Sequence, residues 1–367
     1  MGQITIEEVA KLAGVSPATV SRAIRSPEMV RDSTRKRVLK IIKEKKYVYH
    51  ALAADLSRQR SANIGLIIPS TIGSIFVRTV FAILEKAQEH GYTVTIGNSK
   101  YNPEIEMSVL RTLNERHPAG LLLTGYCVRK EELLEEINRS GIPTVIMWEK
   151  PDDPQLSYVG IDNYSAAYTM TEYLIGLKHQ RIGLILGPYS KVDRVHKRFE
   201  GYRDCLSDHG LPWDDLLVVE KEPTLADGME AMNRLMSLAN RPTAVFAASD
   251  VMAFGAMAAA KEKGLKVPAD VSIAGFDDID FSAYADPPLT TIRVNGIEIG
   301  EMALSCLLDM IENPSPQPRQ ICLKTDLVVR NSCRALEQGM APQARFSKGP
   351  GTEGNINRLT VKKGDEK

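Results

Sequence analysis

The N-terminal fold is decided by residues 4–25, which read ITIEEVAKLAGVSPATVSRAIR. Apolar side chains recur at helical spacing from Ile6 to Ala13 and predict a short amphipathic helix with one buried face. Thr5 precedes two glutamates and is expected to cap the start of this helix. Gly14 is expected to end it, because glycine accepts the left-handed backbone that a sharp turn requires.

A second helix is predicted after this turn, with Ser16 as its cap and Pro17 in its first position. Val20 and Ala23 face inward, which leaves hydroxyl residues and an arginine outside. Such a face suits the recognition helix of a helix-turn-helix, although any two amphipathic helices around a glycine give a similar pattern. The residues expected to contact DNA are Thr5, Ser16, Pro17, Ala18, Thr19, Ser21, Arg22 and, at the start of a third predicted helix over residues 34–47, Thr34.

Positive charge is concentrated in the same part of the chain. Residues 1–62 hold 13 lysines and arginines against 6 acidic residues, a net charge of +7 in a chain whose total is zero. Basic residues line one side of the third predicted helix, opposite an apolar side that includes Val38 and Ile42. A basic segment on an acidic body is typical of a nucleic-acid-binding head, whose phosphate contacts position the protein without reading sequence.

Composition excludes several classes of protein. The chain is 43% hydrophobic and 25% charged, as globular proteins are, and no apolar run approaches the roughly 18 residues of a membrane span. The five cysteines are scattered and form no CxxC pair, which argues against a disulfide framework or a zinc site. No secretory signal is recognised. We therefore expect a cytoplasmic protein that has no metal or other cofactor and no membrane partner.

From Ile64 onward, short β-branched or leucine-rich runs alternate with helical patterns. This alternation predicts parallel, doubly wound sheets, and its repetition in two halves predicts two lobes with a ligand cleft between them. The expected strands are 64–68, 92–97, 120–125, 143–148 and 158–162, then 181–186, 216–220, 243–249 and 271–277, with strands near 289–294 and 323–328 crossing back; the expected helices are 74–90, 103–116, 129–140, 163–179, 193–209, 224–239 and 250–264.

The string AKLAGVSPATVSRAI closely resembles the DNA-reading start of the LacI/GalR-type bacterial transcriptional repressors. The resemblance continues in order through HPAGLLLTG, VGIDNYSAAYTMTEYLI, RFEGYRDCL, AVFAASDVMAFGAM and VPADVSIAGFDDI to PPLTTIRVNGIEIGEMA, over about residues 4–334. A weaker similarity, in RAIRSPEMV and GNSKYNPEIEMSVL, is to repressors of gluconate operons. The family resemblance implies a helix-turn-helix headpiece and a hinge helix, joined to a bilobed α/β domain like that of periplasmic binding proteins, with two doubly wound parallel sheets.

The domain boundaries expected from this resemblance and from the patterns above fall in four parts. They are a headpiece (1–49), a hinge helix and linker (50–62), an effector-binding and dimerisation domain (63–335) and a tail (336–367). Within the effector-binding domain, lobe 1 comprises about 63–161 and 292–321, and lobe 2 about 162–290 and 322–335. The tail is expected to be disordered because it is rich in glycine, proline and charged residues. In these repressors the hinge folds on DNA, pairs with its copy and wedges a leucine into the minor groove. Here that leucine is Leu56, beside Ala53 and Ser57; it would otherwise be a linker leucine.

Residues of the cleft are carried over from the family one at a time. Arg198 stands three residues before the glycine of RxxGY, and its fork of donors suits two hydroxyls or a carboxylate. Asp277 follows a predicted strand, where it either accepts from the effector or caps local backbone. The family's D-I-S-N-P-F-F is replaced by STIGSIF over residues 70–76. The residues expected to bind effector are Ser70, Ser74, Phe76, Trp148, Arg198, Ser249 and Asp277, with Phe76 and Trp148 as stacking faces.

Charge near Arg198 bears on the effector. Arg194, His196, Lys197 and Arg198 gather at the start of one predicted helix, where the helix dipole gives no reason for positive charge. This cluster favours an anionic effector.

We expect a homodimeric, sequence-specific DNA-binding repressor that reads pseudo-palindromic operator DNA. Its operator affinity would be controlled by a small effector between the lobes, a sugar or a sugar acid such as gluconate. A nucleobase that acts as corepressor is the alternative effector, and a solute-binding protein is the alternative class. An enzyme is not expected, because no GxGxxG, Walker, GxSxG or HExxH motif occurs.

Overall fold

A computed structural model of the chain describes residues 4–25, 27–47, 61–69, 75–125, 130–315 and 317–336. Five predicted site residues lie outside the described ranges: Ala53, Leu56, Ser57, Ser70 and Ser74. The predicted tail also lies outside them beyond residue 336. No helix within the described part of the chain is long and apolar enough to cross a membrane.

The headpiece is a three-helix unit with a small core of its own. It consists of α1 (Ile6–Ala13), α2 (Pro17–Arg25), a 3-10 turn η1 (Pro27–Met29) and α3 (Asp32–Lys45). Val9, Val20 and Val38, one from each α-helix, are fully buried against one another. Gly14 ends α1 in the left-handed conformation, with φ of 63°, as predicted. The helix α3 begins two residues before the predicted start and has no side-chain cap.

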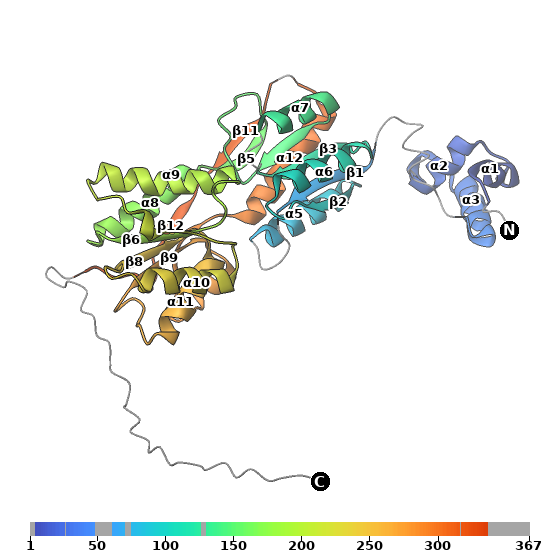
Figure 1. Cartoon of the computed structure of the whole chain (residues 1–367). Coiled ribbons are helices and arrows are strands. Elements are labelled where there is room, and N and C mark those ends of the chain that lie inside the picture. The colour runs from blue at the N-terminus through green and yellow to red at the C-terminus, as the bar shows by residue number, and fades with distance from the viewer. Residues whose placement is uncertain are drawn as a thin grey trace, which may run out of the picture.

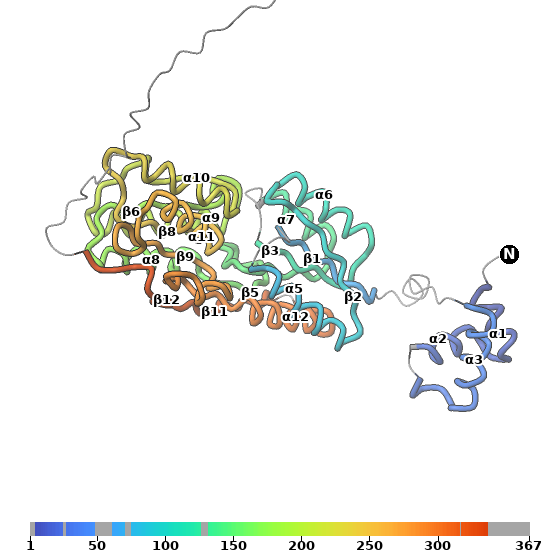
Figure 2. The backbone as a smooth tube through the Cα atoms, turned by 90° about the horizontal axis from the view of Figure 1, so that it is seen from below, coloured from blue at the N-terminus to red at the C-terminus, as the bar shows by residue number. Residues whose placement is uncertain are grey.

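Lobe 1 is a six-stranded parallel sheet in the order β11-β5-β4-β3-β1-β2. Helices α5 and α12 pack together on one of its faces, and α6 and α7 cover the other (Figure 2). Its elements are β1 (Asn63–Ile68), α5 (Phe76–Glu89), β2 (Thr93–Asn98), α6 (Pro103–Asn114), β3 (Gly120–Thr124), α7 (Lys130–Ser140), β4 (Thr144–Met147), β5 (Tyr158–Ile161), α12 (Gly296–Glu312) and β11 (Gln320–Leu323).

Lobe 2 is a second six-stranded sheet, in the order β12-β10-β9-β8-β6-β7. Helices α8 and α9 lie on one face and α10 and α11 on the other (Figure 1). Its elements are α8 (Asn163–Gly176), β6 (Ile182–Leu186), α9 (Asp193–Asp208), η2 (Asp215–Leu217), β7 (Val218–Glu220), α10 (Leu225–Met236), β8 (Ala244–Ala247), α11 (Asp250–Glu262), β9 (Ser272–Asp277), η3 (Asp280–Ala283), β10 (Thr290–Arg293) and β12 (Asp326–Val328).

The fold class is confirmed, with three differences in detail. The sheet of lobe 2 is not wholly parallel, because β12 pairs antiparallel with β10. The single strand expected near 323–328 is two short strands, because the chain passes from β11 in lobe 1 to β12 in lobe 2 at this point. Helix α12 was not among the predicted helices, although it packs along α5 and closes one face of lobe 1.

The chain crosses between the lobes three times, after β5, β10 and β11. Around these crossings the largest apolar cluster continues from one lobe into the other without a break. Trp148 and Ile161 belong to it from lobe 1, and Phe276 and Ile292 from lobe 2. The crossings and this shared core fix the carboxyl ends of both sheets against the same cleft.

The C-terminal end of the described chain is attached to lobe 2 by a buried histidine. His179 hydrogen bonds through Nδ1 to the Thr243 hydroxyl at 2.9 Å and through Nε2 to the Arg334 carbonyl at 3.1 Å. Burial lowers the pKa of His179 to about 4. The ring is therefore neutral at physiological pH, and the Leu336 N–H, which donates to the Leu177 carbonyl at 2.9 Å, completes the attachment.

Candidate functional site

The outward face of α2 is the first candidate site. Pro17, Ala18 and Arg22 are exposed, and no described residue is hydrogen bonded to the Arg22 side chain. The Ser16 hydroxyl accepts from the Thr19 N–H at 3.2 Å and lies 3.0 Å from the Thr19 hydroxyl. Among the described side chains, this face offers the Arg22 guanidinium and two hydroxyls, of Ser16 and Thr19, that already share hydrogen bonds.

Two residues predicted to contact DNA are placed differently. Ser21 is not on the outward face, because it lies beside Val20 at the edge of the buried stripe of α2 and only 9% of it is exposed. Thr5 is occupied within α1: its hydroxyl accepts from the Glu8 N–H, and its own N–H donates to the Glu8 carboxylate at 2.9 Å. Such a reciprocal capping box satisfies helix-end donors rather than reading bases. Thr34 lies half-buried in the first turn of α3.

The second candidate site is a cleft between the lobes, which encloses about 770 Å³ when its open mouth is included. The carboxyl ends of parallel strands meet at this edge, the usual position for ligands in open α/β sheets. The structure brings all five described members of the predicted effector set to it. Its lining is Ile75, Phe76, Tyr101 and Trp148 from lobe 1, and Gly187, Pro188, Arg194, Val195, Arg198, Pro223, Ala248, Ser249, Val251, Met252, Asp277 and Ile279 from lobe 2.

Arg198 lies on the floor of this cleft. Its Nε donates to Asn163 Oδ1 at 2.9 Å and its Nη1 to the Ala248 carbonyl at 2.7 Å, while the guanidinium lies 3.6 Å from the centre of the Phe276 ring. Burial lowers the pKa of Arg198 to about 10, although Asp277 raises it. The group still carries its charge at neutral pH, held in one orientation by its partners.

Asp277 faces the cleft next to Arg198, with 3.9 Å between its Oδ1 and Arg198 Nη1. No described residue donates a hydrogen bond to this carboxylate. Burial raises the pKa of Asp277 to about 7, while the arginine lowers it. Its backbone has φ of 116°, a conformation that non-glycine residues rarely adopt and that persists only where the surroundings enforce it. The residue does not act as a helix cap.

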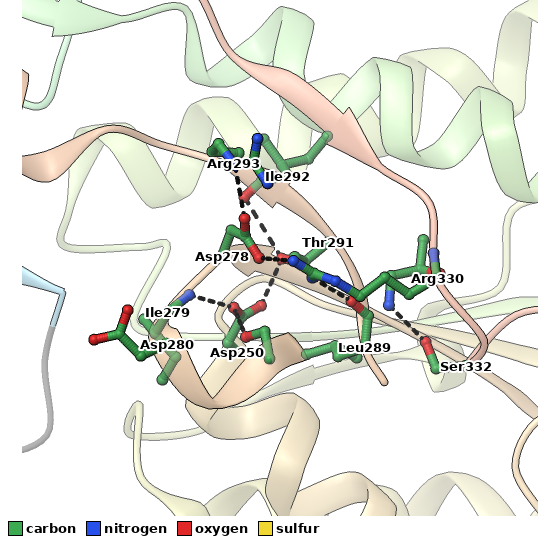
Figure 3. Close-up of polar contacts among 12 residues, drawn as sticks. Asp250, Asp278, Ile279, Asp280, Leu289, Thr291, Ile292, Arg293, Arg330 and Ser332 are labelled. Carbon is green, nitrogen blue, oxygen red and sulfur yellow. Dashed lines mark hydrogen bonds and ion pairs between the residues drawn. The ribbon is translucent and has the colours of Figure 1, made fainter. Parts of the chain in front are cut away.

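A polar clamp behind the cleft enforces this backbone (Figure 3). Asp250, fully buried at the start of α11, accepts from the Ile279 N–H at 3.0 Å, the Ser282 hydroxyl at 2.5 Å and the Thr291 hydroxyl at 2.6 Å. Asp278 binds two arginines, Arg293 Nε and Arg330 Nη2, each at 2.7 Å. The clamp holds Asp278 and Ile279, the two residues that follow Asp277 in the turn after β9.

The aromatic residues of the predicted set form one wall. Phe76 and Trp148 meet edge to face with ring centres 5.0 Å apart, and both also belong to the apolar core. The Trp148 Nε1–H is buried and has no hydrogen-bond partner among the described residues. Ser249 caps α11 through its contact with the Met252 N–H at 3.4 Å. Its hydroxyl is thus partly engaged.

Tyr101 was missed by sequence reasoning. It follows β2 in a loop where Lys100 and Tyr101 have φ of 52° and 54°. These two successive residues in the left-handed conformation turn the Tyr101 ring into the cleft. No local sequence motif predicts this backbone conformation. The residues of the predicted basic cluster do not all line the cleft. Lys197 lies instead in a separate hollow with Lys150 and Asp162.

Known protein families match both the headpiece and the two-lobed part of the chain. Residues 5–49 match the family described as bacterial regulatory proteins, lacI family, and residues 171–333 match the periplasmic binding protein-like domain. The chain is 37% identical to the HTH-type transcriptional repressor CytR of Escherichia coli (strain K12), over 90% of this chain and 97% of that protein. The chain belongs to the LacI family.

Solved structures of transcriptional regulators that are similar to this chain extend over both of its regions. One is the lac repressor dimer bound to operator and the anti-inducer ONPF, with a TM-score of 0.79, 26% identity and coverage of 91% of this chain and 100% of that one. Another is the CelR–cellobiose complex, with a TM-score of 0.67, 30% identity and coverage of 90% and 100%. This LacI-family chain is a DNA-binding transcriptional repressor with an effector-binding domain, and not an enzyme.

Proposed function

We propose that this repressor acts as a homodimer on a pseudo-palindromic operator, and that a sugar or sugar acid bound in the cleft changes its operator affinity. The observation that carries the proposal is the pairing of Arg198 with Asp277 on the cleft floor. A fixed donor beside a free acceptor, 3.9 Å apart, is complementary to two adjacent hydroxyl groups, each of which can accept from one and donate to the other.

The wall of the cleft supports the same class of ligand. Phe76 and Trp148 offer apolar surface against which the C–H face of a sugar ring can pack. The CelR complex holds cellobiose in a related fold. The same aromatic wall also suits a planar nucleobase, which is the second candidate effector.

A homodimer is supported by apolar side chains exposed on both lobes. Phe81 on α5 is 62% exposed, and Phe281 and Tyr284 at η3 are 72% and 86% exposed. The Arg78–Asp280 ion pair, with 2.6 Å between nitrogen and oxygen, brings the first turn of α5 beside η3. Exposed aromatic groups gathered on one side of a monomer are typical of a protein interface, and two headpieces then match two half-sites.

The proposal is tested with the full-length protein and operator DNA selected from a random-sequence pool. Fluorescence anisotropy would measure operator affinity with and without ribose, cellobiose, gluconate and nucleobases. We expect at least one polyhydroxylated compound to change it by about tenfold or more. The Arg198→Lys variant, which keeps the charge but loses the planar fork, should lose this response. The exposed Arg203→Lys on the same helix is the matched control.

Two results would contradict the proposal. If only nucleobases alter operator binding, the second candidate effector replaces the first. If the protein sediments as a monomer both free and on DNA, the homodimer is wrong.

A further inference from the structure

Asn163 joins the wall of the effector cleft to its floor. Its side-chain Nδ2 donates to the Trp148 carbonyl at 3.0 Å, and its Oδ1 accepts from Arg198 Nε at 2.9 Å. Only 3% of the residue is exposed, so water does not compete for either hydrogen bond. Because a carbonyl only accepts and a guanidinium only donates, the two partners fix the orientation of the amide. Both ends of the amide are thus bound to residues that line the cleft.

These hydrogen bonds are not needed to start the helix in which Asn163 lies. Asp162 caps α8, since its carboxylate accepts from the Ser165 N–H at 2.9 Å. Capping often explains an asparagine at the start of a helix, but here the preceding residue fills that role. Asn163 follows the crossing from β5, so its side chain reaches back from lobe 2 to Trp148 in lobe 1.

The wall residue that Asn163 holds has a strained backbone. Trp148 has φ of 69°, a left-handed conformation that bulky residues rarely adopt and that persists only where the surroundings enforce it. Its N–H donates to the Val159 carbonyl at 3.1 Å, and its carbonyl accepts from Asn163. Gly160 allows this close approach, because a Cβ atom there would collide with the backbone of Glu149. The backbone of Trp148 is therefore held by one hydrogen bond from each lobe.

The floor residue that Asn163 holds is the guanidinium expected to bind the effector. Besides Asn163, the neighbours that orient Arg198 are the Ala248 carbonyl and the Phe276 ring. Without the amide, the Nε–H of this buried cation would lose its acceptor, and a charged donor left without a partner is costly. The guanidinium would then turn, and the donors that it presents to the cleft beside Asp277 would change direction.

We propose that Asn163 is a positioning residue of the effector cleft, and that it couples effector binding to the arrangement of the lobes. It orients Arg198 for the effector hydroxyls and, through the same amide, holds Trp148 in the other lobe. A ligand whose affinity depends on the position of the guanidinium therefore shifts the populations of two lobe arrangements. The inference rests on the proposed function, which assigns the effector contacts that Asn163 positions.

Two substitutions separate the two hydrogen bonds. Asn163→Asp has the same shape and still accepts from Arg198, but it cannot donate to the Trp148 carbonyl. Asn163→Leu has a similar volume and makes neither bond. Asn114→Asp is the matched control, because the Asn114 amide donates to the buried Glu136 carboxylate at 2.7 Å, outside the lining of the cleft. The control loses a hydrogen bond of the fold and leaves the effector site untouched.

The first test needs no effector. The chain has two tryptophans, and Trp213→Phe leaves Trp148 as the sole indole. Acrylamide quenching of Trp148 fluorescence in the full-length protein would then report how firmly the wall is held. We expect the quenching constant to rise about twofold or more in Asn163→Asp and Asn163→Leu, because the wall opens locally more often. It should stay unchanged in Asn114→Asp.

The same signal shows whether wall and floor are linked through Asn163. Arg198→Lys removes the Nε donor that Asn163 binds, so it should also increase the quenching of Trp148. In the Asn163→Leu background the same substitution should have no further effect, because the link is already broken. Additive effects of the two substitutions would mean that the residues act independently, and would overturn the inference.

The second test measures transmission from the effector to the operator. Calorimetry would give the affinity for ribose, cellobiose and gluconate, and fluorescence anisotropy would follow operator binding at a saturating concentration of the tightest ligand. We expect Asn163→Asp to bind that ligand roughly 10- to 100-fold more weakly than the wild type. At saturation, the ligand should change its operator affinity by less than about twofold, against about tenfold in the wild type. Asn114→Asp should keep the wild-type affinity and response.

The outcomes distinguish this inference from the proposed function. If Asn163→Asp responds to saturating ligand as the wild type does, the coupling role of Asn163 is wrong and the sugar-sensing repressor remains. Equal quenching of Trp148 in the wild type and in both variants at Asn163 would also overturn the role. If no sugar or sugar acid binds, but the quenching results are as expected, Asn163 positions the cleft and the proposed effector class fails.

Discussion

Asp250 and Asp277 are both buried in lobe 2, but their hydrogen bonding is opposite. Asp250 accepts three hydrogen bonds from its own chain, whereas no described residue donates to Asp277. Asp250 holds a turn, and Asp277 is held by that turn so that it faces the cleft. The contrast teaches that burial and charge alone do not mark a ligand site. What marks it is a polar group whose hydrogen-bonding capacity the fold leaves unused.

The largest expected effect is that of removing the saturated carboxylate. Asp250→Ala leaves the Ile279 N–H and the hydroxyls of Ser282 and Thr291 without their acceptor, in addition to a cavity. We expect the free energy of unfolding to fall by about 3–5 kcal/mol, measured by urea denaturation. If Asp277→Ala costs as much, the contrast between a structural and a ligand-binding carboxylate fails.

The pH dependence of stability sharpens the same contrast. The folded pKa of Asp277, about 7, lies above that of an unfolded aspartate, about 3.9. Its contribution to stability is therefore complete below pH 3.9 and is lost as the pH rises through 7. Asp277→Asn stays neutral, so its unfolding free energy relative to wild type should increase by about 3 kcal/mol between pH 5 and 8. The exposed Asp286→Asn should show no such change.

In the headpiece, Arg22 and Thr5 show the same contrast between a side chain that is available to a ligand and one whose hydrogen bonds are made within the fold. Arg22 is exposed without a hydrogen-bond partner among the described residues, so it is available to a base edge. Arg22→Ala should cost roughly 1–3 kcal/mol of binding at one base pair and relax specificity there, as measured against operators substituted at each position. An equal loss on every sequence would make Arg22 a phosphate contact instead.

Thr5 should give the smallest effect, because its hydrogen bonds lie within the capping box of α1. Thr5→Ala is expected to destabilise α1 by about 1 kcal/mol, seen as faster amide hydrogen exchange in this helix of the full-length protein. Base preference should remain that of the wild type. A changed preference with unaltered exchange would restore Thr5 to the DNA-reading set.

Periodicity and turn residues predicted most of the architecture, because short buried strands and amphipathic helices have strong local patterns. Helix α12 was not predicted, although its sequence has a local helix signal: a capping Asn295 and buried apolar residues at helical spacing. Residues 323–328 were merged into one strand, because passage between lobes leaves no local signal. For the cleft, Arg198 and Asp277 were found through motif resemblance. Tyr101 was not, since its place depends on a left-handed loop and on lobe 2 across the cleft.

Sequence reasoning also could not tell which charges the fold would pair. The basic cluster at the start of α9 predicted an anionic ligand from four residues, but the partners of three of them come from other positions in the chain or from the next helical turn. Only the assembled structure shows which acidic side chains lie beside each of these basic residues. In the same way, the burial of Ser21 depends on how α2 packs against its neighbours. Ser21 was predicted to contact DNA because its side chain is polar.

The attachment of Arg334 to His179 has a practical consequence. The chain leaves lobe 2 at a fixed point, and a ring whose pKa is about 4 keeps that exit unchanged across the range of ordinary buffers. Residue 336 is therefore a suitable junction for a fluorescent reporter or an immobilisation tag. A signal from such a fusion would report on lobe 2 from a position that the His179 hydrogen bonds hold in place.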